Sequence, residues 1–177
     1  MTAPPQMRDV QLVLCGLGGQ GTVFLTRLLA EAALEERRPV LTAETHGMAQ
    51  RGGAVESHLK LGGFHGTTVR QGRADAVMVL DASRLEAGRA YLHPSGTVFA
   101  NAEGDAEGAR ACAATRIAAE HGFARGTNLV LLGFAAASAP ELFPGRAALL
   151  AALDRLSPPT AREANRLAFE AGEKEAA

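Results

Sequence analysis

Cysteine and aromatic residues are scarce in this sequence. Its 177 residues include two cysteines, Cys15 and Cys112, one tyrosine and no tryptophan. Because the cysteines form no CxxC pair, neither a zinc ribbon nor an iron–sulfur cluster can be built from this chain. Cys15 lies in an apolar run, where a thiol is expected to pack as a small buried hydrophobe. This usage is typical of a reducing compartment.

Long apolar runs and an excess of one charge are also lacking. No apolar run approaches the roughly 18 residues of a membrane span, and "MTAPPQMRD" has no signal-peptide core. We therefore expect a cytoplasmic protein with no membrane segment. A formal net charge of −1 provides no basic field for nucleic acid, so no nucleic-acid binding is expected. The length predicts one compact domain over residues 1–177.

Short apolar runs alternate with a helical pattern in the first hundred residues. Four runs predict strands, at 10–16, 39–44, 74–81 and 97–101. The segment "TVFLTRLLAEAALEER" has apolar residues at helical spacing, so the first strand, a glycine turn and this helix open a right-handed βαβ unit. The alternating "AVESHLKLG" (54–62) predicts a half-buried strand, antiparallel at an edge of the sheet.

Only helices are expected beyond residue 104. The patterns place them at 105–120, 128–138, 145–156 and 160–171. Capping boxes are expected at Ser83/Glu86 and Thr160/Glu163. The predicted fold class is therefore α/β: a Rossmann-like three-layer fold with a mostly parallel sheet and a helical C-terminal third.

The glycine turn, "GLGGQG" at residues 16–21, fits the GxGxxG pattern between a strand and a helix. Glycines let a backbone approach a phosphate, which then meets the helix N-terminus. Glu44, at the end of the next strand, lies about where a ribose-binding carboxylate is expected. The pattern also fits a turn with no ligand, and both interpretations stay open.

A polar run, "ETHGMAQRGGAVESH" at residues 44–58, leaves the C-terminal end of the second strand, where ligands bind in open parallel sheets. Arg51 offers a planar fork for a phosphate or carboxylate, and His46 and His58 are acid, base or hydrogen-bond candidates. The alternative is a solvated loop. The two histidines lack metal-site spacing, and Ser57 lacks a GxSxG elbow. Asp81 either touches ligand or caps the next helix.

The two motifs together resemble a known family. "GLGGQGTVFLTRLLAEAA" followed by "TAETHGMAQRGGAVESHLKLG" is similar to the gamma domain of 2-oxoacid:ferredoxin oxidoreductases, and most to the small (beta) subunit of indolepyruvate ferredoxin oxidoreductase. The resemblance continues through "GRADAVMVLD", "RGTNLVLLG" and "NRLAFEAG". The segment after Asn101 is shorter than in the family, and Asp81 replaces a frequent glutamate, which leaves the exact 2-oxoacid open.

The resemblance implies an oxidative decarboxylation that uses thiamine diphosphate and Mg, iron–sulfur clusters, ferredoxin and coenzyme A. This chain lacks the cluster cysteines and the GDG…N pattern for thiamine diphosphate, so those groups are expected on a larger partner subunit. The present chain is expected to be inactive alone, to complete the active site and to help hold coenzyme A. An isolated chain is expected to form a homodimer.

The resemblance implies no catalytic residue here, only residues that contact a cofactor. These are Gly18, Gly19, Gln20, Gly21, Thr22, Thr45, His46, Gly47, Arg51, Gly52, Gly53 and Asn128. Two alternatives stay open. One is a stand-alone NAD(P)-binding protein that uses Glu44, and the other is a ligand-free scaffold whose residues 45–58 form a protein interface.

Overall fold

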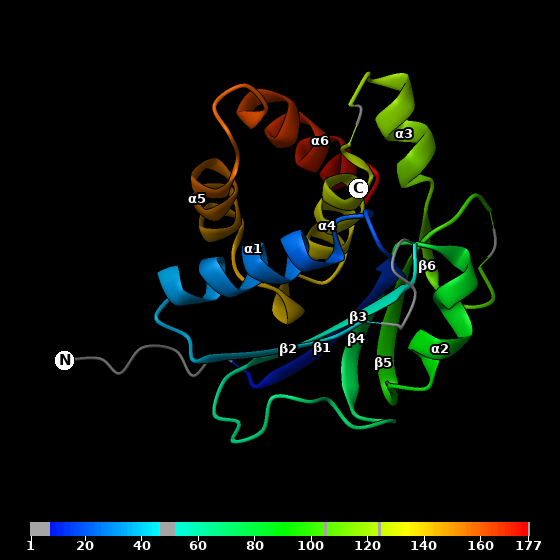
Figure 1. Cartoon of the computed structure of the whole chain (residues 1–177), viewed down its shortest axis with the longest axis vertical. Helices are drawn as coiled ribbons and strands as arrows, with labels where there is room; N and C mark the ends of the chain where they lie inside the picture. The colour runs from blue at the N-terminus through cyan, green and yellow to red at the C-terminus, as the bar shows by residue number, and fades with distance from the viewer. Residues whose placement is uncertain (1–7, 47–51, 105, 124, 177) are drawn as a thin grey trace.

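The computed structural model describes residues 8–46, 52–104, 106–123 and 125–176. Its centre is a six-stranded sheet in the order β2-β3-β1-β4-β5-β6 (Figure 1). The strands are β1 (Val10–Leu17), β2 (Val40–His46), β3 (Ala54–Leu61), β4 (Ala74–Val79), β5 (Leu92–Asn101) and β6 (Arg110–Cys112). The α-helices are α1 (Thr22–Glu35), α2 (Leu85–Arg89), α3 (Ala114–Glu120), α4 (Thr127–Ser138), α5 (Arg146–Leu156) and α6 (Arg162–Lys174).

The helices cover the sheet unequally. The larger core lies between one face of the sheet and α1, α4, α5 and α6, with Leu14 of β1 and Phe99 of β5 fully buried in it (Figure 1). The opposite face carries a smaller core around Val13, Cys15 and Val77, covered by α2 and loops. This arrangement confirms the three-layer α/β fold with a helical C-terminal third.

The sheet is mixed. The pairs β1–β4, β4–β5 and β5–β6 are parallel, whereas β3 runs antiparallel to both β1 and β2. Strand β3 therefore lies between the two strands of the expected βαβ unit, and β2 is the edge strand. The prediction of an edge position for residues 54–62 was wrong, because both sides of β3 are paired.

The expectation that β3 is half-buried was also wrong. Ser57 is 0% exposed on the α1 side of the sheet, and His58 is 2% exposed on the other side. The loop after β3 covers this second side: the Val69 backbone N–H donates to His58 Nδ1 at 3.4 Å. The Tyr91 ring packs edge-on against the His58 ring, with centroids 5.2 Å apart. Alternation of polar residues therefore did not mean exposure here.

Three local predictions in the remaining chain were wrong. Residues 110–112 form strand β6 in register with the end of β5, so the expected helix over 105–120 begins only at Ala114. The side chain of Asp81, not Ser83, caps the helical turn after β4. At the start of α6 no side-chain cap bond forms, since Ala161 is the N-cap residue. The last three expected helices are confirmed as α4, α5 and α6.

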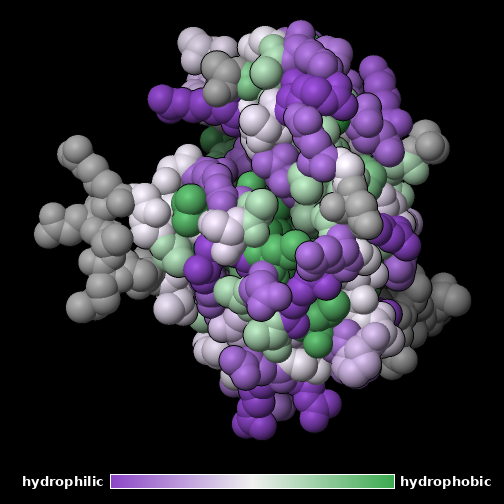
Figure 2. Space-filling model, turned by 90° about the vertical axis from the view of Figure 1, so that its right-hand side faces the viewer, coloured by the Kyte–Doolittle hydropathy of each residue, from purple (hydrophilic) through white to green (hydrophobic). Residues whose placement is uncertain are grey.

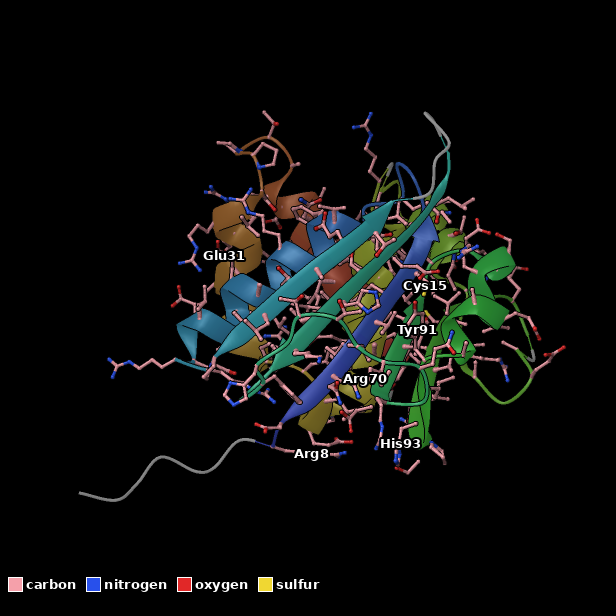
Figure 3. The ribbon with its side chains drawn as sticks, turned by 60° about the horizontal axis from the view of Figure 1, so that its bottom comes forward. Arg8, Cys15, Glu31, Arg70, Tyr91 and His93 are labelled. Carbon is pink, nitrogen blue, oxygen red and sulfur yellow. The ribbon has the colours of Figure 1, made fainter. Side chains whose placement is uncertain are left out.

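Cys15 shows how burial shapes the smaller core (Figure 3). Desolvation by burial, and then the nearby charge of Glu56, raises the pKa of the Cys15 thiol to about 12. Cys15 therefore packs as a neutral hydrophobe, as the sequence predicted.

None of the helices in the described part of the chain has the length and apolar composition that a bilayer crossing requires.

Candidate functional site

The glycine turn is closed by its own hydrogen bonds. The Gln20 backbone N–H donates to the Leu17 carbonyl at 3.1 Å, and the Leu17 N–H donates to Gln20 Oε1 at 2.7 Å. Gly19 and Gly21 have positive φ values of 94° and 84°. Only glycine adopts such angles without strain, so these two positions account for the motif locally.

The turn leads directly into the N-terminus of α1. Gly21 is the N-cap residue, no side chain caps this end, and the first helical N–H bond runs from Leu25 to the Gly21 carbonyl. The N–H groups of the three residues before Leu25 therefore have no partner within the helix. Because these groups and the helix dipole carry partial positive charge, this end favours an anion.

The N-terminus of α4 meets that of α1. The Asn128 Nδ2 group lies 3.5 Å from the Gly21 carbonyl oxygen, and a Cβ atom at Gly21 would approach Nδ2 to 2.3 Å. Asn128 is 7% exposed, and its Oδ1 accepts the Leu129 backbone N–H at 2.9 Å. Glycine at position 21 thus lets the two helix ends converge.

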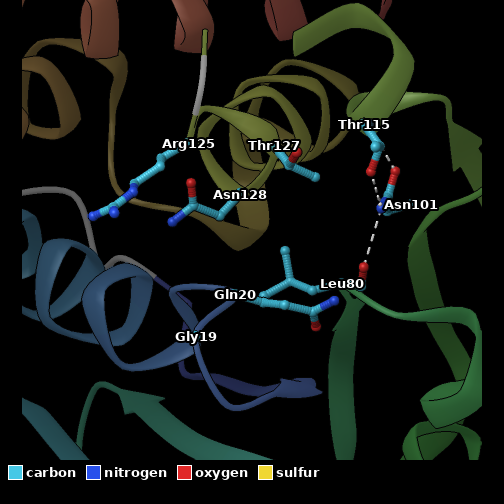
Figure 4. A pocket seen from close by; sticks show the side chains of 8 residues that line it. All are labelled: Gly19, Gln20, Leu80, Asn101, Thr115, Arg125, Thr127 and Asn128. Carbon is cyan, nitrogen blue, oxygen red and sulfur yellow. Dashed lines mark hydrogen bonds between the residues drawn. The ribbon is translucent and has the colours of Figure 1, made fainter. Parts of the chain in front are cut away.

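A cavity of about 490 Å³ lies where these helix ends meet the sheet (Figure 4). Its floor is at the C-terminal ends of the parallel strands, and its roof includes the starts of α3 and α4. The described residues that line it are Gly19, Gln20, Leu80, Asn101, Thr115, Arg125, Thr127 and Asn128. They include one cation and no acidic side chain, so the cavity suits an anionic or polar ligand.

Asn101 fixes one wall of the cavity. Its Nδ2 group donates to the Leu80 carbonyl at 3.1 Å and to Thr115 Oγ1 at 2.8 Å, while its Oδ1 accepts the Thr115 N–H at 3.1 Å. These bonds join the ends of β4 and β5 to the start of α3 (Figure 4). The wall is therefore set by the fold before any ligand arrives.

Three of the expected site residues line this cavity: Gly19, Gln20 and Asn128. Gly52 and Gly53 of the polar run, two more expected residues, pack against Gly18 of the glycine turn. The Gly18 N–H donates to the Gly53 carbonyl at 2.9 Å, and a Cβ atom at Gly18 would lie 3.3 Å from the Gly52 nitrogen. The glycine turn and the end of the polar run are therefore packed against each other. Their role toward a ligand stays a prediction.

Other expected residues lie elsewhere. Thr45 is exposed on the edge strand β2 and pairs with Glu56. Thr22 is buried, with its Oγ1 atom 2.7 Å from where a Cβ of Gly16 would be. Gly47, Arg51 and the side chain of His46 lie outside the described residues.

Glu56 and His58 of the polar run face away from the cavity. Glu56 accepts hydrogen bonds from Arg84 at 2.7 Å and from the Tyr91 hydroxyl at 3.0 Å. Glu44 lies on β2, and β3 separates it from β1. With strands about 4.8 Å apart, this carboxylate is two strands from the glycine turn, farther than the dinucleotide-binding alternative expects.

Sequence reasoning missed five cavity residues: Leu80, Asn101, Thr115, Arg125 and Thr127. The signal existed for Asn101, the last residue of a predicted strand, because ligands bind at the carboxyl ends of parallel strands. Arg125 and Thr127 directly precede an expected helix, which also marks an anion-binding end. Thr115 had no such signal, since the expected helix began nine residues before α3 does.

The side of the molecule that bears β6 and α2 shows a hydrophobic area at its centre, bordered by hydrophilic residues (Figure 2).

In the described part of the chain, no group of three or more His, Cys, Asp or Glu side chains is placed to hold a metal ion.

Comparison with known proteins identifies the class. The family described as pyruvate ferredoxin/flavodoxin oxidoreductase matches residues 11–175, and the chain belongs to this family. A similar relative is the indolepyruvate oxidoreductase subunit IorB of Pyrococcus horikoshii, 32% identical over 96% of this chain and 97% of that protein. IorB of Archaeoglobus fulgidus is 36% identical over 52% of this chain, and the matched part spans 46% of that protein.

Solved structures share the fold. The pyruvate oxidoreductase subunit PORC of Thermotoga maritima has a TM-score of 0.79 and 23% identity, over 94% of this chain and 96% of that one. A 2-oxoglutarate:ferredoxin oxidoreductase from Magnetococcus marinus, with 2-oxoglutarate, coenzyme A and succinyl-CoA bound, has a TM-score of 0.77 and 21% identity. It covers 96% of this chain, which corresponds to 31% of that longer chain.

Proposed function

We propose that this chain is the small, non-catalytic subunit of a thiamine-diphosphate-dependent 2-oxoacid:ferredoxin oxidoreductase, and that its cavity holds an anionic part of coenzyme A. The observation that carries the proposal is the meeting of the glycine turn and the α4 N-terminus, with Arg125, at one cavity. Similarity to IorB along nearly the whole chain supports an aryl 2-oxoacid such as indolepyruvate as the substrate class.

The residues present fit this ligand. A Cβ atom at Gly19 would have nothing within 4 Å, so a phosphate can approach the backbone of the glycine turn closely. The glycine-turn backbone at Gly19, the Thr115 and Thr127 hydroxyls and the Arg125 guanidinium would bind its oxygens. Coenzyme A supplies the thiol that accepts the acyl group. This chain binds and orients the coenzyme and supplies no acid, base or nucleophile.

The other reactive groups belong to a larger partner in this proposal. Cys15 and Cys112 are both buried, and burial is the main cause that raises the pKa of each thiol, which disfavours the thiolate that a cluster needs. Thiamine diphosphate, Mg and the iron–sulfur clusters would be on the partner, and ferredoxin would contact the complex. The complex would work in the cytoplasm, and the isolated chain would form a homodimer.

A direct test combines the purified chain with its large subunit. The combination should reduce an artificial electron acceptor in the presence of indolepyruvate and coenzyme A, and neither protein should do so alone. Arg125→Ala should raise the KM for coenzyme A roughly tenfold, because a charge-assisted hydrogen bond to phosphate is lost. The control Arg155→Ala removes an exposed arginine of α5 that pairs with Glu35, and it should leave this KM unchanged.

Two results would overturn the proposal. If no complex forms and the lone chain binds NAD(P) tightly, the stand-alone dinucleotide-binding function replaces it. If the complex is active but Arg125→Ala and Arg155→Ala have equal effects on the KM for coenzyme A, the cavity does not hold the coenzyme. The chain would then be a scaffold within the complex.

A further inference from the structure

The Gln20 side chain connects two parts of the fold. Its Oε1 atom accepts the Leu17 backbone N–H at 2.7 Å, within the glycine turn. Its Nε2 group donates to Asp81 Oδ2 at 3.0 Å, just beyond the end of β4. In Figure 4 the Gln20 side chain lies along the cavity floor beside Leu80, away from Thr127 and Asn128. Both ends of its amide are therefore engaged by the protein.

Asp81 is itself held firmly. Its Oδ1 atom accepts the Ser83 backbone N–H at 3.1 Å and the Ser83 hydroxyl at 2.6 Å. These bonds leave Oδ2 directed at Gln20. Asp81 does not line the cavity, so its carboxylate is not itself a contact for a ligand there. Its contact with the glycine turn passes through Gln20.

The same β4–α2 turn, residues 81–84, makes a second contact with the site. Arg84 donates to Glu56 Oε1 at 2.7 Å, and both side chains are mostly buried, at 23% and 18% exposure. Glu56 lies in β3, shortly after Gly52 and Gly53. The Gly18 N–H donates to the Gly53 carbonyl at 2.9 Å. The β4–α2 turn is therefore connected to the glycine turn at two places, through Gln20 and through the start of β3.

We propose that the β4–α2 turn positions the glycine turn for its ligand, with Asp81 acting through Gln20 and Arg84 acting through Glu56. This inference rests on the proposed function for the identity of the ligand. Asp81 and Arg84 are positioning residues: neither touches the coenzyme. Their effect is to hold the loop in the shape that places Gly19 and Gln20 at the wall of the cavity.

Amide hydrogen exchange of the isolated chain tests the first contact without any ligand. In Asp81→Ala the Leu17 amide should exchange at least roughly tenfold faster, because Gln20 loses its anchor. The matched control is Ser83→Ala, which removes one hydrogen bond to Asp81 and keeps the Gln20–Asp81 bond. Its Leu17 amide should exchange within about twofold of wild type. Equal acceleration in the two variants would overturn the proposal.

Coenzyme A affinity of the complex with the large subunit gives the second readout. Asp81→Ala should weaken it roughly tenfold, as expected when a bond to a charged group is lost. Gln20→Ala should weaken it equally, and the double variant should be no weaker than either single one. Additive losses would show that the two residues act separately, and this outcome contradicts the proposal.

Gln20→Glu keeps the proposal testable if Asp81→Ala does not fold. It keeps the acceptor for the Leu17 N–H and places a second carboxylate against Asp81. At neutral pH the Leu17 amide should exchange faster than in wild type, and acidification should restore protection as the pair takes up a proton. A pH-independent effect would contradict the mechanism.

Arg84→Met should accelerate exchange of the Gly18 amide, which tests the second contact, and an unchanged Gly18 amide would remove Arg84 from the proposal.

The two readouts separate this inference from the proposed function. If the wild-type complex fails to bind coenzyme A while the Leu17 amide responds as expected, the ligand is wrong and the positioning stands. If coenzyme A binds but Asp81→Ala behaves like Ser83→Ala, the proposed function stands and the positioning is wrong.

Discussion

Gly133 of α4 and Gly172 of α6 bring the backbones of these two helices into contact. A Cβ atom at Gly133 would lie 2.0 Å from the Phe169 carbonyl oxygen, and one at Gly172 would lie 1.9 Å from the Val130 carbonyl oxygen. No side chain can be inserted at either position unless the helices separate. Since α4 also carries Asn128 and Thr127, this contact holds one wall of the cavity in place.

Gly133→Ala and Gly172→Ala should therefore each destabilise the fold, by about 2–3 kcal/mol or more, because overpacking forces the helix backbones apart. Urea unfolding followed by circular dichroism would measure the loss. Gly66→Ala is the control, because a Cβ atom there meets nothing within 4 Å. Losses no larger than that of the control would show that α4 and α6 are not packed as described.

Gly19 and Gly21 separate backbone strain from steric collision in the glycine turn. Both have positive φ, but a Cβ atom at Gly19 enters open space, whereas one at Gly21 meets Asn128. Gly19→Ala should cost about 1–2 kcal/mol of stability from strain alone. Gly21→Ala should cost more, since the buried Asn128 side chain must also shift away from Gly21. Denaturant unfolding of both variants would decide, and equal losses would count against the Asn128 contact.

His58 should make stability depend on pH. Burial, the largest cause, lowers the pKa of His58 from 6.5 in the fold. Below pH 6.5 the unfolded chain therefore binds a proton that the folded chain does not, and stability falls as the pH falls, until the folded pKa is reached. The slope from one such group is at most about 1.4 kcal/mol per pH unit.

Urea unfolding at a series of pH values from 7.5 to 5, in roughly half-unit steps, measures this effect. In His58→Gln the acid-side loss of stability should be smaller than in wild type. His65→Gln, at an exposed position in the loop after β3, is the control and should keep the wild-type profile. A profile unchanged by His58→Gln would mean that the imidazole titrates alike in both states.

The two thiols should be unreactive in the folded protein. Cys15 is 0% exposed and Cys112 is 4% exposed. Burial is the largest cause that raises the pKa of Cys15 to about 12 and the pKa of Cys112 to about 11. Thiolate, the reactive form, is therefore scarce at pH 8. A chromogenic disulfide reagent should label neither cysteine under native conditions and both in urea. Rapid native labelling would contradict the buried positions.

Much of the fold could be predicted from local patterns. The branched apolar run before Gly16 and the helical spacing after Gly21 are properties of contiguous residues, so β1, the glycine turn and α1 were found. The position of β3 was not. Whether a strand lies at an edge depends on which strands pair with it, and residues 54–61 look the same in either place. Burial of His58 depends on a loop that crosses it later in the chain.

The candidate site could also be predicted only in part from the sequence. Gly19, Gln20 and Asn128 were expected from motifs, and they line one cavity. Asn101 and Arg125 join them only through folding, because Asn101 ends a strand and Arg125 precedes a helix far along the chain. The sequence also could not show that Gln20 is engaged by Leu17 and Asp81. A hydrogen-bonding side chain in a motif can serve the loop instead of the ligand.

Strand β3 runs antiparallel between β2 and β1 and is paired with both along nearly its whole length. Its side chains alternate between the two faces of the sheet, so Leu59 and Leu61 lie in the larger core and His58 is buried on the opposite face. A slip of β3 by one residue would therefore move all of its side chains to the other face and break two ladders at once. The register of this one strand couples the packing of the two faces, so a change that shifts it disturbs both together.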